Sequence, residues 1–459
     1  MQNALDIFLN QKRFDLIFKW LYLQYPDNNF IKESYLESIR AFNNFYEENP
    51  SDNIKKEGPD AFIKRFEELF TSIKKTGFIS NNHSIPIGNN NEISDGAHRL
   101  TICAFLNLQI ATQKDNSDEL YDYIFFRRKM MDSKIMDFGA LQYVKLNPNA
   151  YIVHIHSIVN MNKDNQICNL LNSYGFIYYQ KNIYLNFNGY VNLKKISYGI
   201  YGEKENWIGD NKNNFMGAQE HAKLSLGKNP MRVFIFVCSS FDKILKVKQE
   251  IRKLLDMGNH SIHINDKKEE AITLAKIYFN DNSLNMINYR SFKYESKLLD
   301  TRIQKLSKIA AEHDISIEDM CACGSTPLNV YGLRESNDFD FIAKTNSKKI
   351  LNIQDSDLSN NESELYLYPN SKQEIIENPN FHFYYNNFKF ISLDILYKMK
   401  KKRNEKPKDI QDCKLIKKAL KGRNAWSDFK IYSKKKYGLR REIILFNCIK
   451  FYYTKKKKQ

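Results

Sequence analysis

Two aspartates separated by a single residue, Asp338 and Asp340, carry the clearest chemical signal in the sequence. The segment NDFDFI alternates acidic and apolar residues, so a β-strand there would place both carboxylates on one face. Two such carboxylates repel each other unless a cation lies between them, and Mg²⁺ takes one or two carboxylates together with phosphate oxygens. Upstream, Gly324 and Ser325 predict a turn whose backbone N–H groups can approach a phosphate closely. Residues 321–342 therefore predict a site for a metal-bound nucleoside triphosphate.

This segment, CACGSTPLNVYGLRESNDFDFI, resembles the G-S…D-x-D signature of the DNA polymerase beta-like nucleotidyltransferase superfamily. The resemblance implies that Asp338 and Asp340 are catalytic and bind Mg²⁺ or Mn²⁺. It also implies that Gly324 and Ser325 bind the phosphates of a nucleoside triphosphate substrate, ATP or CTP. The alternative is an ordinary strand whose two aspartates face solvent.

The residues that follow resemble nucleotidyltransferases of the abortive-infection type. An apolar strand leads to Asp394, Lys400 follows six residues later, and KPKDIQDCKLI places Asp409 and Asp412 on one helix face. The resemblance implies that Lys400 or Lys398 reaches the triphosphate and that Asp409 orients basic side chains or contacts the active site. Asp394 is the candidate third metal-binding carboxylate, and its alternative role is a helix N-cap.

The N-terminal residues 1–80 are expected to be helical, because apolar residues recur at i, i+3 and i+4 in FIKESYLESIRAFNNFYEE and DAFIKRFEELFTSIKKTG. Gly77 is expected to end the second of these helices. A short strand over 84–87 and a GNNN turn follow.

The next segment, ISDGAHRLTICAFLNL, predicts a strand that ends at Asp95–Gly96 and a helix that begins there. Asp95, Gly96, His98 and Arg99 would then cluster at a helix N-terminus, which attracts phosphate through its free N–H groups. The order of elements and the motif D-G-A-H-R-L resemble the ParB/sulfiredoxin fold. That fold serves DNA-partition CTPases, sulfiredoxins and kinases of free serine, and a kinase-like, phosphate-binding module is the expectation here. The alternative is that Asp95 caps the helix and the other side chains are structural.

The middle region, from Ala150 to about residue 290, alternates β-prone and helical segments in the order of a split β-α-β, ferredoxin-like domain. Its segment HSIHIND…EEAITLAKIYF resembles the catalytic segment of nucleoside diphosphate kinases. The resemblance makes His263 the catalytic phosphate acceptor, Arg252 a phosphate-binding residue and Tyr198 a support for the histidine. The sequence departs from that family, because no K-P-D-G follows the first strand. The alternative is that His263 is an ordinary polar residue of a strand.

Composition sets wider limits. The 459 residues suffice for two to four domains, and 42% hydrophobic residues suffice for packed cores. No apolar run approaches the length of a transmembrane helix, and MQNALDIFLNQKRF has no signal-peptide pattern, so we expect a cytoplasmic protein without a transmembrane segment. The seven cysteines form no CxxC pair, so free thiols are expected in place of zinc sites or disulfides.

The net charge of +17 is concentrated after residue 398, in runs such as KMKKKRNEKPK and the terminal KKKK. Such a basic C-terminus can bind nucleic acid, an anionic membrane or an acidic polymer. Charge alone does not distinguish these partners.

These observations predict three α/β domains: a ParB/sulfiredoxin-like domain over 1–148, a nucleoside diphosphate kinase-like domain over 149–290, and a nucleotidyltransferase domain over 291–459. The order of these modules also resembles proteins encoded with bacterial capsule or surface-glycan genes. The resulting expectation is a Mg²⁺-dependent phosphotransferase or nucleotidyltransferase acting on a small hydroxyl compound or glycan. The alternatives are a toxin- or defence-type nucleotidyltransferase modifying RNA or protein, and a CTP-dependent DNA-binding protein of the partition type.

Overall fold

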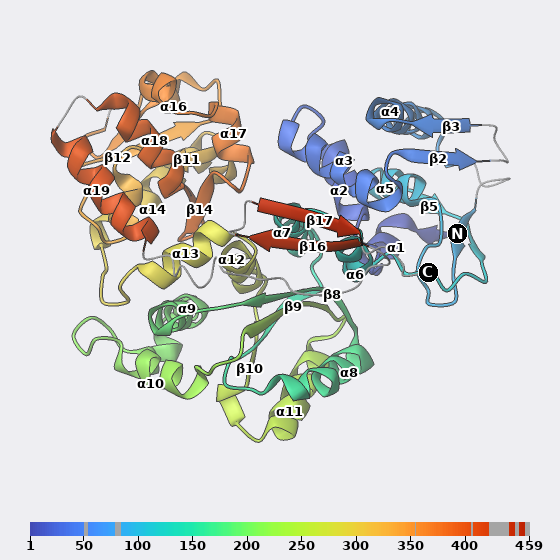
Figure 1. Cartoon of the computed structure of the whole chain (residues 1–459), viewed down its shortest axis with the longest axis horizontal. Helices are drawn as coiled ribbons and strands as arrows, with labels where there is room; N and C mark the ends of the chain where they lie inside the picture. The colour runs from blue at the N-terminus through green and yellow to red at the C-terminus, as the bar shows by residue number, and fades with distance from the viewer. Residues whose placement is uncertain are drawn as a thin grey trace. The chain divides into compact units, whose positions relative to one another are not determined.

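The computed structural model describes residues 1–49, 54–78, 84–353, 355–404, 407–421, 440–445 and 449–454. The chain forms two compact units: unit 1 is Met1–Asn182 with Gly227–Ala275, and unit 2 is Ile183–Leu226 with Lys276–Gln459. Figure 1 traces the chain through both units from blue to red. Both units combine helices with strands, so the mixed α/β class predicted from the sequence is confirmed.

The N-terminal part of unit 1 is mainly helical. Its helices are α1 (Ala4–Leu9), α2 (Leu16–Gln24), α3 (Asn29–Asn43), α4 (Pro59–Thr76), α5 (Ala97–Phe105), α6 (Tyr123–Arg128) and α7 (Ser133–Leu146). Its short strands pair two by two: β1 (Gln2–Asn3) with β5 (Gln109–Ile110), β2 (Tyr46–Asn49) with β3 (Ile54–Glu57), and β4 (Ile85–Ile87) with β6 (Thr112–Lys114).

The expectation of helix throughout residues 1–80 is wrong at the three short strands β1, β2 and β3. Helix α3 ends where Asn44 adopts a left-handed conformation with φ of 55°, and the following Tyr46–Asn49 forms strand β2. Asparagine accepts this conformation more readily than most residues, so it ends a helix whose apolar periodicity continues. The predicted end of α4 is confirmed, because Gly77 follows its last residue with φ of 71°.

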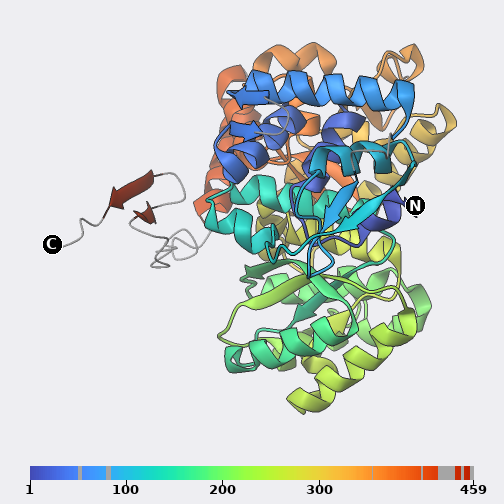
Figure 2. The same cartoon turned by 90° about the vertical axis from the view of Figure 1, so that its right-hand side faces the viewer.

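The remainder of unit 1 is a four-stranded sheet in the order β10-β7-β9-β8. The strands are β7 (Ala150–Ile155), β8 (Phe176–Ile183), β9 (Met231–Val237) and β10 (Ile262–Ile264), and the helices are α8 (Asp164–Tyr174), α11 (Phe241–Leu255) and α12 (Lys268–Tyr278). Strand β7 is antiparallel to both of its neighbours. Helices α8 and α11 cover the same face of this sheet (Figures 1 and 2) and supply its apolar core with Ile167, Leu171, Ile244 and Val247.

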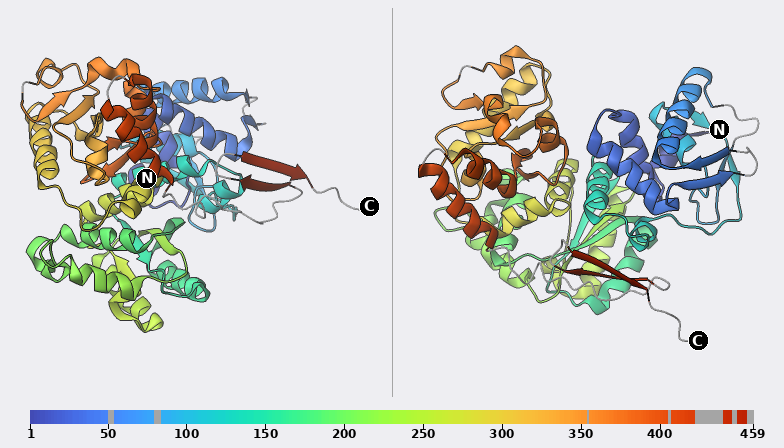
Figure 3. Two further views of the ribbon diagram at one scale, coloured as in Figure 1. Left: turned by 60° about the vertical axis from the view of Figure 1, so that its left-hand side comes forward. Right: turned by 45° about the horizontal axis from the view of Figure 1, so that its top comes forward.

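Unit 2 is built on a five-stranded sheet in the order β13-β12-β11-β15-β14. The strands are β11 (Met320–Ala322), β12 (Phe339–Ala343), β13 (Leu358–Asn360), β14 (His382–Tyr385) and β15 (Phe388–Ile391). Its helices are α9 (Phe187–Gly199), α10 (Met216–Ser225), α13 (Asp281–Tyr289), α14 (Lys297–Glu312), α15 (Thr326–Val330), α16 (Lys348–Leu351), α17 (Lys372–Glu377), α18 (Leu393–Arg403) and α19 (Pro407–Lys421). Helices α18 and α19 lie side by side (Figure 3).

The unit boundaries differ from the boundaries predicted at 148/149 and 290/291. The first segment and the four-stranded sheet belong to one unit because aromatic and charged side chains join them. Tyr143 of α7 stacks on Tyr178 of β8 with ring centroids 3.4 Å apart, and Asp137 pairs with Lys181 at 2.6 Å.

Helix α9 belongs to unit 2 although it lies inside the predicted middle domain. The buried Asn192 of this helix donates hydrogen bonds to the carbonyls of Ile287 and Arg290, at 2.8 and 2.7 Å. The guanidinium of Arg290 in turn donates to the carbonyl of Val330 beside the five-stranded sheet. These buried contacts tie residues 183–226 to the C-terminal half of the chain.

The basic C-terminal runs lie largely outside the described residues, which include only a hairpin of β16 (Arg440–Leu445) and β17 (Ile449–Thr454) beyond α19. Cys448 and the terminal lysines likewise fall outside them. Within the described ranges, none of the helices has the length and apolar character needed to span a bilayer.

Candidate functional site

The strand order of unit 2 gathers the predicted nucleotide site at one edge of the sheet. Strand β11 runs parallel to β15 and antiparallel to β12. The residues that follow β11, the residues that follow β15 and the residues that precede β12 therefore meet at the same edge. Gly324 and Ser325, the start of α18, and Asp338 all stand there.

The glycine turn and the second aspartate are in direct contact. Gly324 adopts φ of 57°, and a β-carbon at this position would lie 1.8 Å from Oδ2 of Asp340. The Ser325 backbone N–H donates to the same carboxylate, and the Asp340 N–H donates to the Thr326 hydroxyl at 3.2 Å. Only glycine lets the chain pass so close to the carboxylate while holding a left-handed conformation.

Asp340 lies on the polar face of β12, as the alternation of the sequence predicts, and Asp338 stands one residue before the strand. Phe339 and Phe341 are fully buried on the opposite face. Burial and the charge of Asp338 raise the pKa of Asp340 to about 6. A carboxyl group in this condition gains from a bound cation, because the cation offsets both the lost hydration and the repulsion.

The backbone N–H groups of the turn have partners other than the predicted phosphate. The Ser325 N–H bonds Asp340, and the Gly324 N–H donates to the phenolic oxygen of Tyr368 at 3.3 Å. The turn therefore positions the Asp340 carboxylate, and phosphate contacts would require the Gly324 N–H to leave Tyr368 and the Ser325 N–H to leave Asp340.

A lattice of ion pairs lies under the same edge, between α18 and α19. Lys400 places Nζ 2.9 Å from Asp412 and 3.4 Å from Asp409, and all three side chains are at most 2% exposed. Burial raises the pKa values of both aspartates, but their bonds to basic side chains outweigh it and hold both pKa values below the ordinary range. Asp409 and Asp412 are therefore ionised, and the sequence-based expectation that Asp409 orients basic side chains agrees with this geometry.

Two arginines extend the lattice outward. Arg403 donates to Asp409 and, through Nη1, to both carboxylate oxygens of Glu364, at 2.8 and 2.9 Å. Arg334 donates from Nε and Nη2 to the two oxygens of Asp412, at 2.6 and 2.8 Å. Such two-point contacts fix a guanidinium in orientation as well as in position.

Charged residues of this lattice affect the pKa of Asp340. Beyond burial and Asp338, the charge of Glu364 raises the pKa of Asp340 and the charge of Lys400 lowers it. Lys400 is thus close enough to Asp340 for its charge to act on this carboxylate. It is enclosed by Asp409 and Asp412, however, and does not extend towards solvent to meet a triphosphate.

Asp394 stands in the first turn of α18, at the same sheet edge. The alternative that it caps the helix is wrong, because the N-cap residue is Ser392. Across the described residues, no three side chains of His, Cys, Asp or Glu are gathered as a metal-binding group, so Asp394 is not assembled with the aspartate pair.

The residues of unit 1 that were predicted to bind phosphate separate into an exposed ion pair and a buried histidine. Asp95 and Arg99 form an ion pair of 3.5 Å, with the Asp95 side chain 80% exposed, and Gly96 precedes α5 in a left-handed conformation. His98 instead hydrogen bonds the Tyr35 hydroxyl at 3.0 Å and packs edge-on against Phe66. Burial, followed by the charge of a nearby lysine, holds the pKa of His98 well below its usual value. His98 is therefore neutral, and its side chain contacts residues of α3 and α4.

His263 is enclosed in the sheet of unit 1. It is 5% exposed, its Nε2 lies 2.7 Å from Oε1 of the fully buried Glu270, and its ring stacks on His154 of the neighbouring strand. Its neighbours Ile262 and Ile264 face the core that α8 and α11 cover, so His263 points to the opposite face.

The other two residues predicted to assist His263 lie elsewhere. Arg252 belongs to α11, on the face opposite His263. Tyr198 belongs to unit 2, where its ring contacts Trp207 with centroids 5.0 Å apart. Within unit 1, Arg252 and His263 therefore do not form the pair that the kinase resemblance implies.

Sequence reasoning missed four residues of this site: Arg334, Glu364, Tyr368 and Arg403. Arg334 had a usable signal, because it lies four residues before Asp338 in the same motif. Glu364 and Tyr368 come from a polar segment in which no periodicity distinguishes them from their neighbours.

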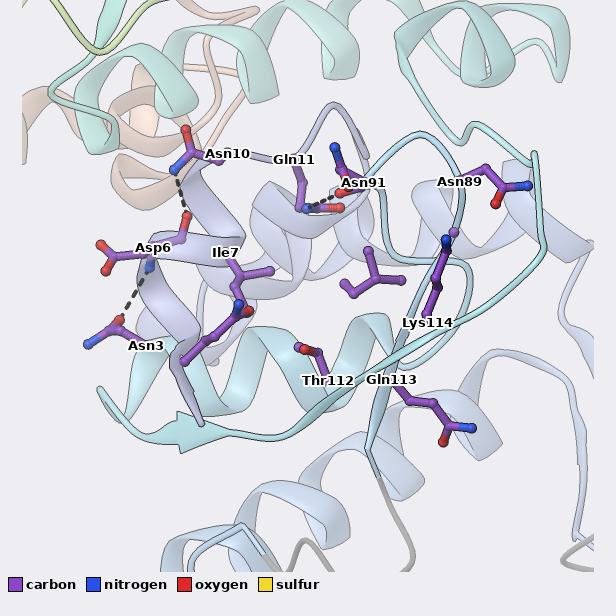
Figure 4. Close-up of a pocket in the computed structure, with 13 residues that line it drawn as sticks. Asn3, Asp6, Ile7, Asn10, Gln11, Asn89, Asn91, Thr112, Gln113 and Lys114 are labelled. Carbon is purple, nitrogen blue, oxygen red and sulfur yellow. Dashed lines mark hydrogen bonds between the residues drawn. The ribbon is translucent and has the colours of Figure 1, made fainter.

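A wide surface hollow of about 910 Å³ lies elsewhere, in unit 1 (Figure 4). Amide side chains from β1, from β6 and from the loops after α1 and after β4 line it, including Asn3, Gln11, Asn91 and Gln113. Several of these amides are already bonded within the protein, such as Gln11, which donates to the carbonyl of Asn91. None of the predicted site residues lines this hollow.

Compared with known proteins, the chain matches no family model, no curated protein and no solved structure.

Proposed function

We propose that unit 2 carries a Mg²⁺-dependent nucleotidyl transfer site that uses a nucleoside triphosphate, ATP or CTP, and a hydroxyl acceptor such as a sugar or polyol. The observation that carries the proposal is the contact between Gly324 and the Asp340 carboxylate, with the charge of Asp338 acting on that carboxylate from just before the strand. Without a cation, a tight turn that holds two half-buried, like-charged carboxylates close together costs electrostatic free energy.

In this proposal, Asp338 and Asp340 would hold the Mg²⁺ or Mn²⁺ ion, which stabilises negative charge on the phosphates. The acceptor hydroxyl oxygen bonds to the α-phosphorus, the bond to the bridging oxygen breaks, and pyrophosphate leaves with that electron pair. The hydroxyl proton passes to solvent. The Ser325 N–H and the Thr326 hydroxyl keep Asp340 in place throughout.

The enclosure of His263 favours nucleotidyl transfer over the phosphohistidine chemistry predicted for the middle region. A histidine that accepts a phosphoryl group must reach the γ-phosphorus, and His263 is 5% exposed and bonded to Glu270.

The test follows pyrophosphate, orthophosphate and nucleoside diphosphate during incubation with Mg²⁺ and each of ATP, CTP, GTP and UTP, with pooled sugars and polyols as acceptors. We expect pyrophosphate release that is lost in Asp338→Asn and kept in Asp355→Asn. Asp355 is a matched control, because it is an ion-paired aspartate of the same unit outside the site. Diphosphate formation that is insensitive to Asp338→Asn would overturn the proposal in favour of a kinase.

The acceptor class is tested separately. An RNA acceptor, the toxin-type alternative, requires RNA binding whose affinity falls steeply with salt. Stimulation of pyrophosphate release by RNA and not by sugars or polyols would replace the proposed acceptor while leaving the transfer chemistry in place.

A further inference from the structure

The cation nearest to the aspartate pair, Lys400, is not the cation best placed to meet a triphosphate. Its side chain is 2% exposed and its ammonium group is shared by two buried carboxylates. Moving it onto a phosphate would leave Asp409 and Asp412 without this charge in a buried setting, which is costly.

Arg334 is the most exposed cation of the lattice. Its side chain is 19% exposed, against 14% for Arg403 and 2% for Lys400. Three of its five N–H groups are used: two bind Asp412, and one donates from Nη1 to the Glu335 carbonyl at 2.8 Å. In the described part of the chain, the remaining two, one on each terminal nitrogen, have no acceptor.

Arg334 lies in the segment that leads into the proposed metal site. Arg334 precedes Asp338 by four residues in the loop between α15 and β12. The end of this loop is fixed from the other side by Arg302, which donates to the carbonyls of Ser336 and Asn337 at 3.1 and 2.5 Å.

We propose that Arg334 binds the triphosphate of the nucleotide, and that Asp412 and Lys400 are positioning residues that hold its guanidinium ready. Asp412 binds one edge of the guanidinium. The two remaining N–H groups, one on each terminal nitrogen, can donate to phosphate oxygens. Lys400 supplies the second positive charge that keeps Asp412 ionised while Arg334 is in contact with the ligand. This inference rests on the proposed nucleotidyl transfer function.

The test measures Mg²⁺-dependent binding of inorganic tripolyphosphate to the full chain by calorimetry, which removes any contribution of the base. We expect Arg334→Gln to weaken binding by about tenfold or more, and Arg334→Lys to restore part of it, because the charge returns without the fork. The matched control is Arg232→Gln, because Arg232 is an ion-paired arginine of unit 1 outside the site, and this variant is expected to lower the melting temperature without changing the affinity. Tripolyphosphate affinity in Arg334→Gln within twofold of the wild type would overturn the inference.

Failure of this inference is distinguishable from failure of the proposed function. Wild-type pyrophosphate release together with an unchanged KM for the nucleotide in Arg334→Gln and Arg334→Lys would overturn the role of Arg334 and leave the function standing. Tripolyphosphate binding that depends on Arg334, in a protein that releases no pyrophosphate from any nucleotide, would overturn the function and support the site. A wild-type chain that binds no tripolyphosphate in the presence of Mg²⁺ would overturn the inference.

Discussion

A β-carbon on Gly324 would lie 1.8 Å from Oδ2 of Asp340, so the conformation of the turn and the position of the carboxylate depend on each other. Gly324→Ala must therefore move the carboxylate as well as strain the backbone. We expect at least a hundredfold loss of pyrophosphate release. The matched control is Gly258→Ala, because Gly258 has a similar φ of 52° and open space around its α-carbon. That variant should show only the backbone cost of about 1 kcal/mol. Equal loss of activity in both variants would show that the contact between Gly324 and Asp340 does not determine the activity.

Asp338→Asn is expected to stabilise the metal-free protein while it abolishes transfer. After burial, the charge of Asp338 is the main cause of the raised pKa of Asp340, so its removal relieves repulsion. A gain of about 1 kcal/mol corresponds to about 2–4 °C in melting temperature. The gain should shrink at pH 5, where Asp340 is protonated. Thermal unfolding with chelator at pH 7.5 and pH 5 measures both, and a lower melting temperature for the variant at pH 7.5 would contradict the repulsion.

The pH dependence of metal binding follows from the same carboxyl group. Burial and Asp338 raise the pKa of Asp340 to about 6, so the folded protein binds this proton more tightly than the unfolded chain does. As pH falls through 6, the metal-free protein is stabilised and Mg²⁺ must displace a proton. Mg²⁺ affinity should therefore fall by up to about tenfold per pH unit below 6. Calorimetric titration between pH 5 and 8 measures it, and constant affinity over that range would show that Asp340 does not hold the ion.

Lys400→Met should be strongly destabilising, because Asp409 and Asp412 would share less positive charge in a buried setting. Breaking such a buried lattice costs about 3–5 kcal/mol. The comparison is Lys305→Met, because Lys305 pairs with Asp355 and Asp357 but is 38% exposed, and exposed pairs contribute about 0–1 kcal/mol. Urea unfolding of both variants measures the difference. Equal free energies of unfolding would mean that the lattice is not a structural element.

His263 is expected to contribute to stability and not to phosphoryl transfer. Incubation with a nucleoside triphosphate labelled at the γ-phosphate should give no acid-labile label on this residue, because the imidazole is enclosed and bonded to Glu270. His263→Ala should lower the free energy of unfolding by about 1–3 kcal/mol, since it leaves a buried carboxyl without this bond. Acid-labile phosphate that disappears in His263→Ala would restore the kinase hypothesis.

The local signals of the sequence were sufficient where neighbours in the chain set the geometry. Alternation in NDFDFI predicts the strand that carries Asp338 and Asp340, and the glycine next to Ser325 predicts the turn beside it. The same holds for the end of α4 at Gly77. These features depend on backbone conformation and on a period of two or 3.6 residues, which a single sequence displays.

The missed features depend on contacts between distant residues. Asp412 meets Arg334 across 78 positions of the chain, and Tyr368 meets Gly324 across 44. The enclosure of His263 depends in part on such a contact, because its ring stacks on His154 of the neighbouring strand.

The chain leaves unit 1 after Asn182, returns at Gly227 and leaves again after Ala275. During synthesis, residues 183–226 therefore emerge before the Ile287 and Arg290 carbonyls that Asn192 binds. They cannot make these contacts until the later residues have been synthesised. Expression of unit 2 alone consequently requires a graft: residues 183–226 joined by a linker ahead of residue 276. A simple truncation at residue 291 would remove α13, which packs against β14, together with α9, which packs against α13.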